Sequence, residues 1–324
     1  MTTNTKKVPP VNTEIKKRRP FVLDVLRRMV KEKPLATFGL AVIVILLLTG
    51  IFANFLAPYG QNEIHLADAL QSPSGKYWLG TDQLGRDVLS RLIFGARVSL
   101  IIGLSATLLS TCISIIIGAT SAYMGGKLDL IVQRFVDVWV CIPWFLLVMT
   151  VMSVIPNKNG SLIPIILVLG VSGGIGGSRF IRSAVIAIKS NLYVSATEAI
   201  GCGPVRTLIR HILPNIMAPI IISFTIGVGG NIMTEASLSF LGFGVPLGVP
   251  SWGSMISLEG QRYFQTAPEL ILWPIFALSI VVYGINMFGD GLRDLLDPRL
   301  RGGVGRYTIS PAKLAKIKAD LTNN

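Results

Sequence analysis

The feature that most constrains this chain is a series of six long apolar stretches. The first, residues 35–57, contains no charged residue in 23 positions. About 20 apolar helical residues cross the ~30 Å hydrocarbon core of a bilayer, so each stretch is long enough for one crossing. A transmembrane β-barrel would instead show segments of about ten residues with alternating polarity, a pattern these uninterrupted runs do not have. The sequence therefore predicts an all-α, polytopic membrane protein with six transmembrane helices. The expected spans are residues 35–57, 98–123, 132–156, 160–182, 212–238 and 270–292.

Composition and charge placement agree with a membrane protein. Charged residues make up 15% of the chain, against about 25% in soluble domains. The net charge is +13, and ten Lys and Arg lie in residues 1–36 while seven lie in residues 293–324. Basic residues gather in the cytoplasmic segments of membrane proteins, whereas a nucleic-acid module would place them on one folded face. We therefore expect both termini in the cytoplasm, the lipid of the inner (cytoplasmic) membrane around the spans, and no nucleic-acid partner.

The same distribution divides the chain into three parts. Residues 1–34 form a basic cytoplasmic segment, residues 35–300 a transmembrane domain, and residues 301–324 a cytoplasmic tail. Within the domain, the connection at 58–97 carries four basic and four acidic residues and is expected outside, while the loop at 190–214 is expected in the cytoplasm.

The sequence offers little evidence for metal-binding, cofactor-binding or catalytic motifs on this chain. Three cysteines and two histidines are too few and too scattered for a disulfide framework or a metal site. A G-x-x-x-x-G-K-[ST] phosphate loop does not occur, so we expect no cofactor bound by this chain. Residues 170–174 match the G-x-S-x-G pattern of serine hydrolases, but neither histidine lies in a span where it could act as the base. Small residues four apart favour close helix packing there, and we expect no catalytic residue.

The loop at 190–214 reads as two short helices with a break between them. Ser195 and Glu198 have the spacing of a capping box, Gly201 suits the position that ends a helix, and Pro204 suits the first position of the next. Either the loop is a capped connector on the membrane surface, or it is a short amphipathic element presented to a cytosolic partner.

This loop resembles the coupling (EAA) loop of ABC-importer permeases, in which Glu-Ala-Ala, three residues, Gly, nine residues and Ile-x-Leu-Pro follow one another. Here residues 195–197 read Ser-Ala-Thr, His211 stands at the isoleucine position, and the spacing from the glycine to Leu-Pro is kept. The resemblance implies a loop that docks onto ATPase subunits. Its expected coupling residues are Ser195, Ala196, Thr197, Glu198, Gly201, Arg206, Arg210, Leu213 and Pro214.

Three further segments resemble the oligopeptide/dipeptide/nickel group of these permeases, and specifically its second permease subunit. They are residues 79–91, residues 238–244 with 250–253, and residues 289–300, and the resemblance runs from about residue 38 to 301. It implies one of two non-identical permease subunits of an importer for di- or oligopeptides. The implied partners are a second permease subunit, one or two cytosolic ATPases that hold ATP and Mg²⁺, and an extracytoplasmic substrate-binding protein.

Alternatives remain at two levels. Within the family, the cargo could be a nickel chelate, glutathione or an oligosaccharide instead of a peptide. From other classes, the sequence leaves an intramembrane hydrolase, which lacks its base, and a stand-alone secondary carrier or channel.

Polar side chains in and near the spans supply the remaining candidates. Intramembrane charge is functional by default, although pairing with a neighbour or snorkelling to the interface is an equally ordinary explanation. The candidates for a translocation path are Asn231, Thr234, Glu235, Asp137 and Asn286. In the outer connection, Asp87 is near enough to Arg86 and to Arg91 to pair with them if the segment is helical. These pairs indicate a structural network that shapes the outer mouth, with direct contact to a binding protein as the alternative. The expected members of this network are Asp82, Arg86, Asp87 and Arg91.

Overall fold

The computed structural model describes residues 21–155, 160–246, 248–257 and 261–296. The tail at 301–324 and the first twenty residues of the basic segment lie outside the described residues. Within the described part, five helical segments are long and apolar enough to cross a membrane: α2 (Pro34–Ile51), α4 (Val88–Met124), α7 (Ile163–Lys189), the run Pro204–Phe240 that contains α10 (Met217–Phe240), and α13 (Glu269–Leu296). The all-α, multi-pass architecture is confirmed.

A sixth crossing requires two helices to be taken together. The span expected at 132–156 is divided into α5 (Gly126–Cys141) and α6 (Trp144–Val154), whose axes differ by 80°. Pro143 stands at the break, and a proline disfavours helical backbone at the residue before it, here Ile142. The second expected span also differs, because α4 begins at Val88, inside the connection expected at 58–97.

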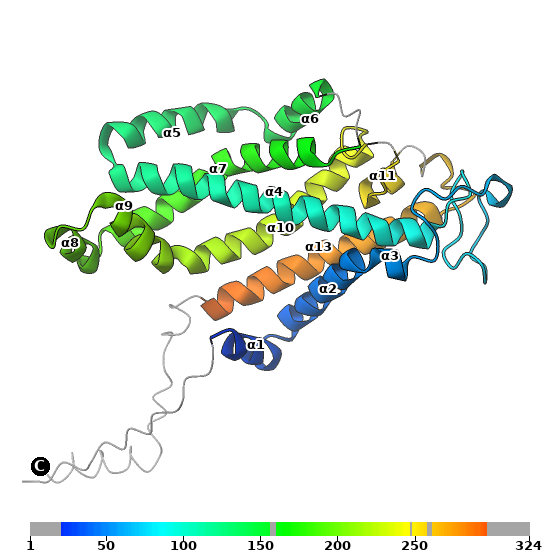
Figure 1. Ribbon diagram of the computed structural model, residues 1–324, viewed down its shortest axis with the longest axis horizontal. Helices are drawn as coiled ribbons and strands as arrows, with labels where there is room; N and C mark the ends of the chain where they lie inside the picture. Colours follow the sequence, from blue (N-terminus) through cyan, green and yellow to red (C-terminus); the bar gives the residue numbers. More distant parts are fainter. Residues whose placement is uncertain (1–20, 156–159, 247, 258–260, 297–324) are drawn as a thin grey trace, which may run out of the picture.

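Helix α4 is the centre of the bundle. Among the described residues its most extensive contact is with α7, and α10 and α2 lie on its other sides (Figure 1). The connection between α3 (Ala53–Leu56) and α4 gathers at one end of the long axis, while α8 (Leu192–Ala199) and α9 (Pro204–Thr207) lie at the opposite end. We call these the α3–α4 end and the α8–α9 end.

Small residues bring α4 and α7 together. A methyl group at Gly174 would lie 2.7 Å from the Cβ atom of Ile113, and one at Gly118 would lie 2.3 Å from the carbonyl oxygen of Ser178. The hydroxyl of Ser114 donates to the carbonyl oxygen of Gly174 at 2.9 Å. The packing interpretation of the glycine pattern at 170–174 is therefore confirmed.

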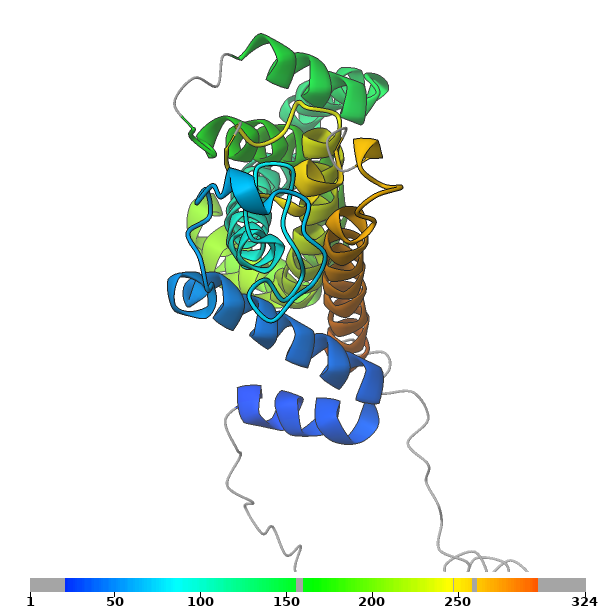
Figure 2. The same cartoon turned by 90° about the vertical axis from the view of Figure 1, so that its right-hand side faces the viewer.

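The first and last long helices are also neighbours. Gly39 of α2 approaches the carbonyl oxygen of Gly284 of α13 so closely that a Cβ atom at Gly39 would lie 2.2 Å from it. Beneath them lies a helix in the basic segment, α1 (Phe21–Glu32), which Figure 2 shows crossing under α2. Its Met29 is buried against α2 and α13, and Lys33 binds Asp294 at 2.5 Å.

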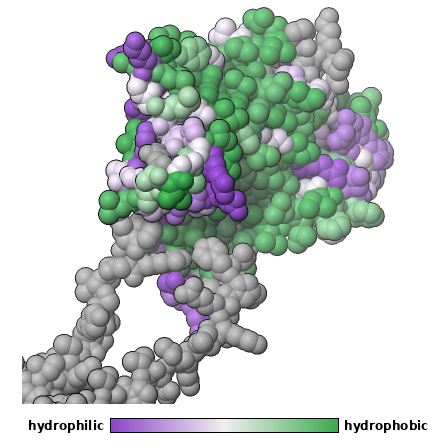
Figure 3. Space-filling model, turned by 60° about the vertical axis from the view of Figure 1, so that its left-hand side comes forward, coloured by the Kyte–Doolittle hydropathy of each residue, from purple (hydrophilic) through white to green (hydrophobic). Residues whose placement is uncertain are grey.

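The surface has the distribution expected of a membrane protein. Figure 3 shows hydrophobic side chains over a broad face of the molecule, between two ends at which hydrophilic residues gather. Because exposed apolar patches of this extent are unfavourable in water, the face fits lipid or other subunits.

Candidate functional site: the α8–α9 end and the charged groups of the bundle

The break in the 190–214 loop has the expected geometry. Gly201 has a φ of +80°, the left-handed conformation that glycine adopts without strain, and the amide of Cys202 donates to the carbonyl oxygen of Thr197 at 3.0 Å. Pro204 is the first residue of α9. The expectations for Gly201 and Pro204 are therefore confirmed.

The expected capping role of Ser195 is wrong. Helix α8 begins at Leu192, and the amide of Val194 already bonds to the carbonyl oxygen of Asn191 at 2.9 Å. Ser195 is therefore the fourth residue of the helix, exposed on its surface, and not the residue before the first turn. The side chain of Glu198 lies outside the described residues.

The loop is anchored on one side by apolar side chains. Val194, Ile212 and Ile216 are buried with residues of α4 and α7 in one cluster. Thr207 is also fully buried, and Thr197 is buried with its hydroxyl on the carbonyl oxygen of Val194 at 2.7 Å. The orientation of α8 and α9 is thus set by the ends of the two central helices.

The other side of the loop is exposed and mixes apolar with basic residues. Ile200, Val205 and Ile209 are exposed, as are Arg206 and Arg210. Four of these residues line a shallow hollow together with Pro214. Leu213 is half-buried on the inner side.

An irregular helical run joins this loop to α10. The segment η2 (Leu208–Ile212) has the wide π-helical hydrogen-bonding pattern, and η3 (Leu213–Ile216) has the tight 3₁₀ pattern. Interruptions of this kind inside helices are frequent at functional sites. The loop thus continues into a long helix with little intervening coil.

Two polar residues of α10, Asn231 and Glu235, contact the central helix α4. Glu235 is fully buried, and its carboxyl accepts hydrogen bonds from Ser239 at 2.7 Å and Ser99 of α4 at 3.3 Å. Asn231 donates to Thr107 of α4 at 2.8 Å. These contacts hold α10 against α4.

Two further path candidates, Thr234 and Asn286, lie on α10 and α13. The hydroxyl of Thr234 bonds to the carbonyl oxygen of Gly230 in its own helix at 2.8 Å. Asn286 is half-buried on α13. The role of these α10 and α13 residues in a path stays a prediction.

Asp137 lies in a different setting, between α5 and α7. It forms ion pairs with Arg179 of α7 and, at 3.3 Å, with Arg134 of its own helix. A second ion pair joins the same helices, because Arg182 donates to both carboxylate oxygens of Asp129 at 2.8 and 2.7 Å. The two arginines are separated by almost one helical turn, so both face α5.

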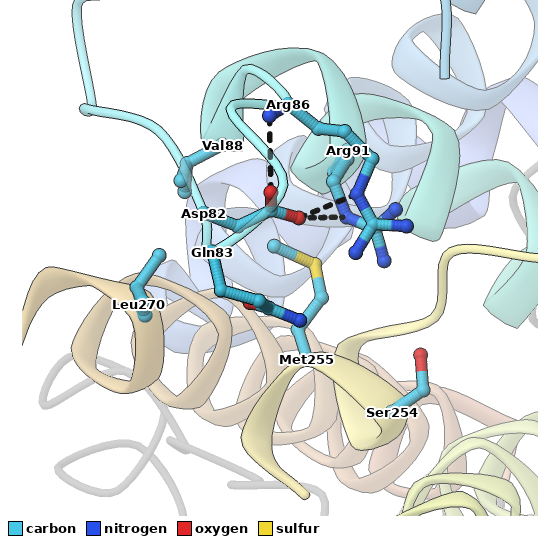
Figure 4. Close-up of a pocket in the computed structure, with 8 residues that line it drawn as sticks. All are labelled: Asp82, Gln83, Arg86, Val88, Arg91, Ser254, Met255 and Leu270. Carbon is cyan, nitrogen blue, oxygen red and sulfur yellow. Dashed lines mark hydrogen bonds and ion pairs between the residues drawn. The ribbon is translucent and has the colours of Figure 1, made fainter. Parts of the chain in front are cut away.

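The four charged residues expected as an outer network are buried at the α3–α4 end, and Figure 4 shows three of them, Asp82, Arg86 and Arg91, side by side. Asp82 accepts from the Arg86 side chain at 2.6 Å and lies 3.6 Å from the Arg91 guanidinium. The expected partner of these arginines was Asp87, which instead caps α4 by accepting from the amide and hydroxyl of Ser90 at 2.8 and 2.6 Å. The pairing differs because residues 82–87 form a turn and the helix begins at Val88.

Two contact groups were not identified from the sequence. Asp68 accepts from Lys76, Tyr77 and Gln71 within 3.0 Å in the α3–α4 connection, and these donors hold the pKa of the Asp68 carboxyl below its usual range. Ser99 and Ser239, which surround Glu235, form the second group. Neither has a spacing signal, because serine is common in packed membrane helices and the Asp68 partners are brought together only by the turns of the connection.

A cavity of about 660 Å³ lies beside the Asp82 cluster. Arg86 and Arg91 line it, together with residues 239–246 and Met152 of α6. The cavity faces the same end of the molecule as the α3–α4 connection.

Comparison with known proteins gives consistent matches over most of the chain. Residues 110–302 match a family described as the inner membrane component of binding-protein-dependent transport systems. Residues 21–73 match the N-terminal transmembrane domain of oligopeptide transport permease C.

Individual relatives are similar over nearly their whole length. The oligopeptide transport system permease protein OppC of Bacillus subtilis is 38% identical over 84% of this chain and 88% of that protein. The dipeptide permease DppC of Alkalihalophilus pseudofirmus is 36% identical over 85% and 89%. The glutathione permease GsiD of Escherichia coli is 32% identical over 85% and 90%.

Proposed function

Since the chain belongs to the family of inner membrane components of binding-protein-dependent transport systems, we propose that it is a permease subunit of an ABC importer that carries di- and oligopeptides. The peptide cargo is supported by similarity to oligopeptide and dipeptide permeases, at 36–38% identity. Glutathione is the alternative that has a specific observation in its favour, at 32% identity.

The proposed complex contains several chains. It has a second, non-identical permease subunit, one or two cytosolic ATPases that bind ATP and Mg²⁺, and an extracytoplasmic substrate-binding protein. The broad hydrophobic face of this chain supports contacts with lipid and with the second permease.

In the proposed orientation, the α8–α9 end and both termini lie in the cytoplasm. The support is the concentration of Lys and Arg near the termini, together with Arg206 and Arg210 in the 190–214 loop. A single cysteine at Ser190 should then react with an impermeant thiol reagent only after the cells are permeabilised, and one at Ser74 should react in intact cells. Reaction of the Ser190 variant in intact cells would reverse the orientation.

The single observation that carries the mechanism is the two-sided loop at 190–214. Its inner side is fixed to α4 and α7 by buried Val194 and Ile212, and its outer side presents Val205 and Ile209 beside exposed arginines. That surface fits a cytosolic partner with an apolar hollow and an acidic rim. An ATPase whose contacts with the loop differ between nucleotide states would then move α10 through η2 and η3.

Reconstitution tests this function. Vesicles that contain both permeases, the ATPases and the loaded binding protein should take up labelled peptide only with ATP. Charge reversal of Arg206 and Arg210 to Glu should weaken ATPase co-purification, and the loss should depend on salt, because exposed charges are screened over about 10 Å at 0.1 M salt. Uptake without ATPases would favour a secondary carrier, and peptide cleavage by this chain alone would favour a hydrolase.

A further inference from the structure

A hollow of about 440 Å³ lies between α5 and α7, on the side of the bundle away from α2. Gly173, Gly176 and Gly177 of α7 line its floor. A Cβ atom at Gly176 would point toward Val140, 4.0 Å away, so the absence of a side chain there leaves space in the hollow. Trp139 and Trp144 flank it, and the Arg179 side chain lines it, paired with Asp137. We call this space the α5–α7 groove.

Arg179 lies just past the midpoint of α7, directly after the uncharged residues 163–178. Helix α7 runs from Ile163 to Lys189, so its midpoint is Gly176. Arg179 is three residues further on, which is about 4.5 Å along the axis at 1.5 Å per residue. The nearer end of the helix is ten residues away, or about 15 Å.

The groove is therefore unsuited to lipid. The side chains of Arg179 and Asp137 are each 44% exposed. Exposed charges are costly in hydrocarbon, so these side chains require a water-filled cavity or another polar surrounding.

The local charge is not balanced. Arg134 and Arg179 both contact Asp137, so two guanidinium groups share one carboxylate. The surplus is positive, which suits an anionic group, and the tryptophans beside it offer apolar surface. A peptide with a free C-terminal carboxylate has both properties.

We propose that the α5–α7 groove lines the aqueous translocation path and that Arg179 contacts the C-terminal carboxylate of the passing peptide. This proposal rests on the peptide-importer function proposed above. It places the path on the α7 side of the bundle, whereas Asn231 and Glu235 hold helices together on the opposite face of α4.

The neighbouring ion pair provides a matched control. Asp129 and Arg182 also join α5 to α7, but their side chains are only 17% and 31% exposed, and they form a two-point contact with each other. This pair satisfies its own hydrogen bonds, so it holds the two helices and offers little to a ligand.

Thiol accessibility tests the aqueous path. In the assembled importer, with Cys112, Cys141 and Cys202 replaced by alanine, Val140→Cys places a thiol in the groove, and Ile45→Cys places one on exposed α2. A negatively charged methanethiosulfonate should modify Val140→Cys at least about tenfold faster, because the reactive thiolate forms in water. Addition of peptide-loaded binding protein and ATP should change the rate at which the Val140→Cys thiol is modified. An unreactive Val140→Cys thiol in every nucleotide state, with normal uptake, would mean that a dry contact with the second permease fills the groove.

Paired substrates test the role of Arg179. Uptake is measured at saturating loaded binding protein for one peptide with a free C-terminus and for its amide. Arg179→Gln should reduce the rate about tenfold for the free acid, the value of one charge-assisted hydrogen bond, and leave the amide rate nearly unchanged. Arg182→Gln should lower the uptake rates of the free acid and of the amide by the same factor. If Arg179→Gln also lowered both rates by the same factor, the proposed contact with the carboxylate would be overturned.

These experiments separate the two proposals. If the unaltered complex takes up no peptide of any length, the proposed cargo fails, while reaction of Val140→Cys still reports an aqueous path. If peptide uptake is normal and the groove is unreactive, only the present proposal fails.

Discussion

Gly201 offers a sharp test of the coupling loop, because its substitution changes only the backbone. Its φ is +80°, and a Cβ atom there would meet no other atom within 4 Å. Steric collision with the rest of the protein is thus excluded, and the whole cost comes from the left-handed conformation. For a β-branched residue that strain is about 1–3 kcal/mol, whereas asparagine enters this region readily. Gly201→Val should therefore be unfavourable and Gly201→Asn close to neutral.

The strain translates into a measurable loss. At 1.4 kcal/mol per factor of ten, 1–3 kcal/mol reduces the fraction of loops in the docking geometry roughly 5- to 150-fold. The bend between α8 and α9 opens, while the anchors Val194 and Ile212 keep the transmembrane bundle intact. We expect the Gly201→Val permease to reach normal membrane abundance and to pair with the second permease, but to lose ATPase co-purification and ATP-driven uptake.

The assay compares Gly201→Val, Gly201→Asn and the unaltered chain at matched abundance, by affinity purification of the complex and by peptide uptake into vesicles. Normal uptake and normal ATPase yield for Gly201→Val would refute the argument and leave the loop as a connector. Equal defects in both variants would mean that absence of a side chain, and not backbone conformation, is required at this position.

Three further predictions concern packing, the α3–α4 end and pH. Gly174→Ala should lower the melting temperature of the purified complex, because its methyl group meets Ile113 at 2.7 Å, whereas Gly230→Ala, with open space around it, should not. Asp82→Ala should lower the free energy of unfolding by about 3–5 kcal/mol, because it leaves buried guanidinium groups without their carboxylate. Limited proteolysis should then cut the α3–α4 connection, and a variant as resistant as the unaltered chain would contradict this. The pKa of the Asp68 carboxyl is lowered in the folded protein, so its ionised form stabilises the α3–α4 connection. This stabilisation is complete above the unfolded pKa of about 3.9 and is lost as the pH falls through the folded value. The rate of proteolytic cleavage in the connection should therefore be constant from about pH 7 to 5 and rise only below about pH 4. A rise already at about pH 6 would assign the transition to another group.

Features set by local chain chemistry were predictable from the sequence. The uncharged stretches predicted the long helices, because in hydrocarbon the backbone amide and carbonyl groups can form hydrogen bonds only with each other. Gly201 and Pro204 were interpreted correctly because each acts through its own backbone. The family resemblance supplied the transport function, which composition alone could not provide.

Features that depend on contacts between distant segments were not predictable. Ser195 has a capping spacing, yet the anchoring of Val194 at the ends of α4 and α7 moves the helix start to Leu192. Asp82, and not Asp87, pairs with Arg86 and Arg91, because a turn precedes α4 and Asp87 caps the helix. Glu235 is buried between α10 and α4, and its contact with Ser99 across that interface has no signal in the local sequence.

The neighbouring positions of α2 and α13 have a consequence for biosynthesis. The α2 surface around Gly39 packs against a helix that begins 218 residues after α2 ends, at Glu269. At about 5–20 residues per second, the ribosome needs roughly 10–45 s to produce that partner. During this interval the α2 surface around Gly39 faces the bilayer without its partner helix, and an insertase or another nascent permease can bind to it. The contact between α2 and α13 is therefore the last helix contact of the bundle to form. Truncations within α13 should leave α2 inserted in the membrane but unassembled, and such chains would be substrates for membrane quality control.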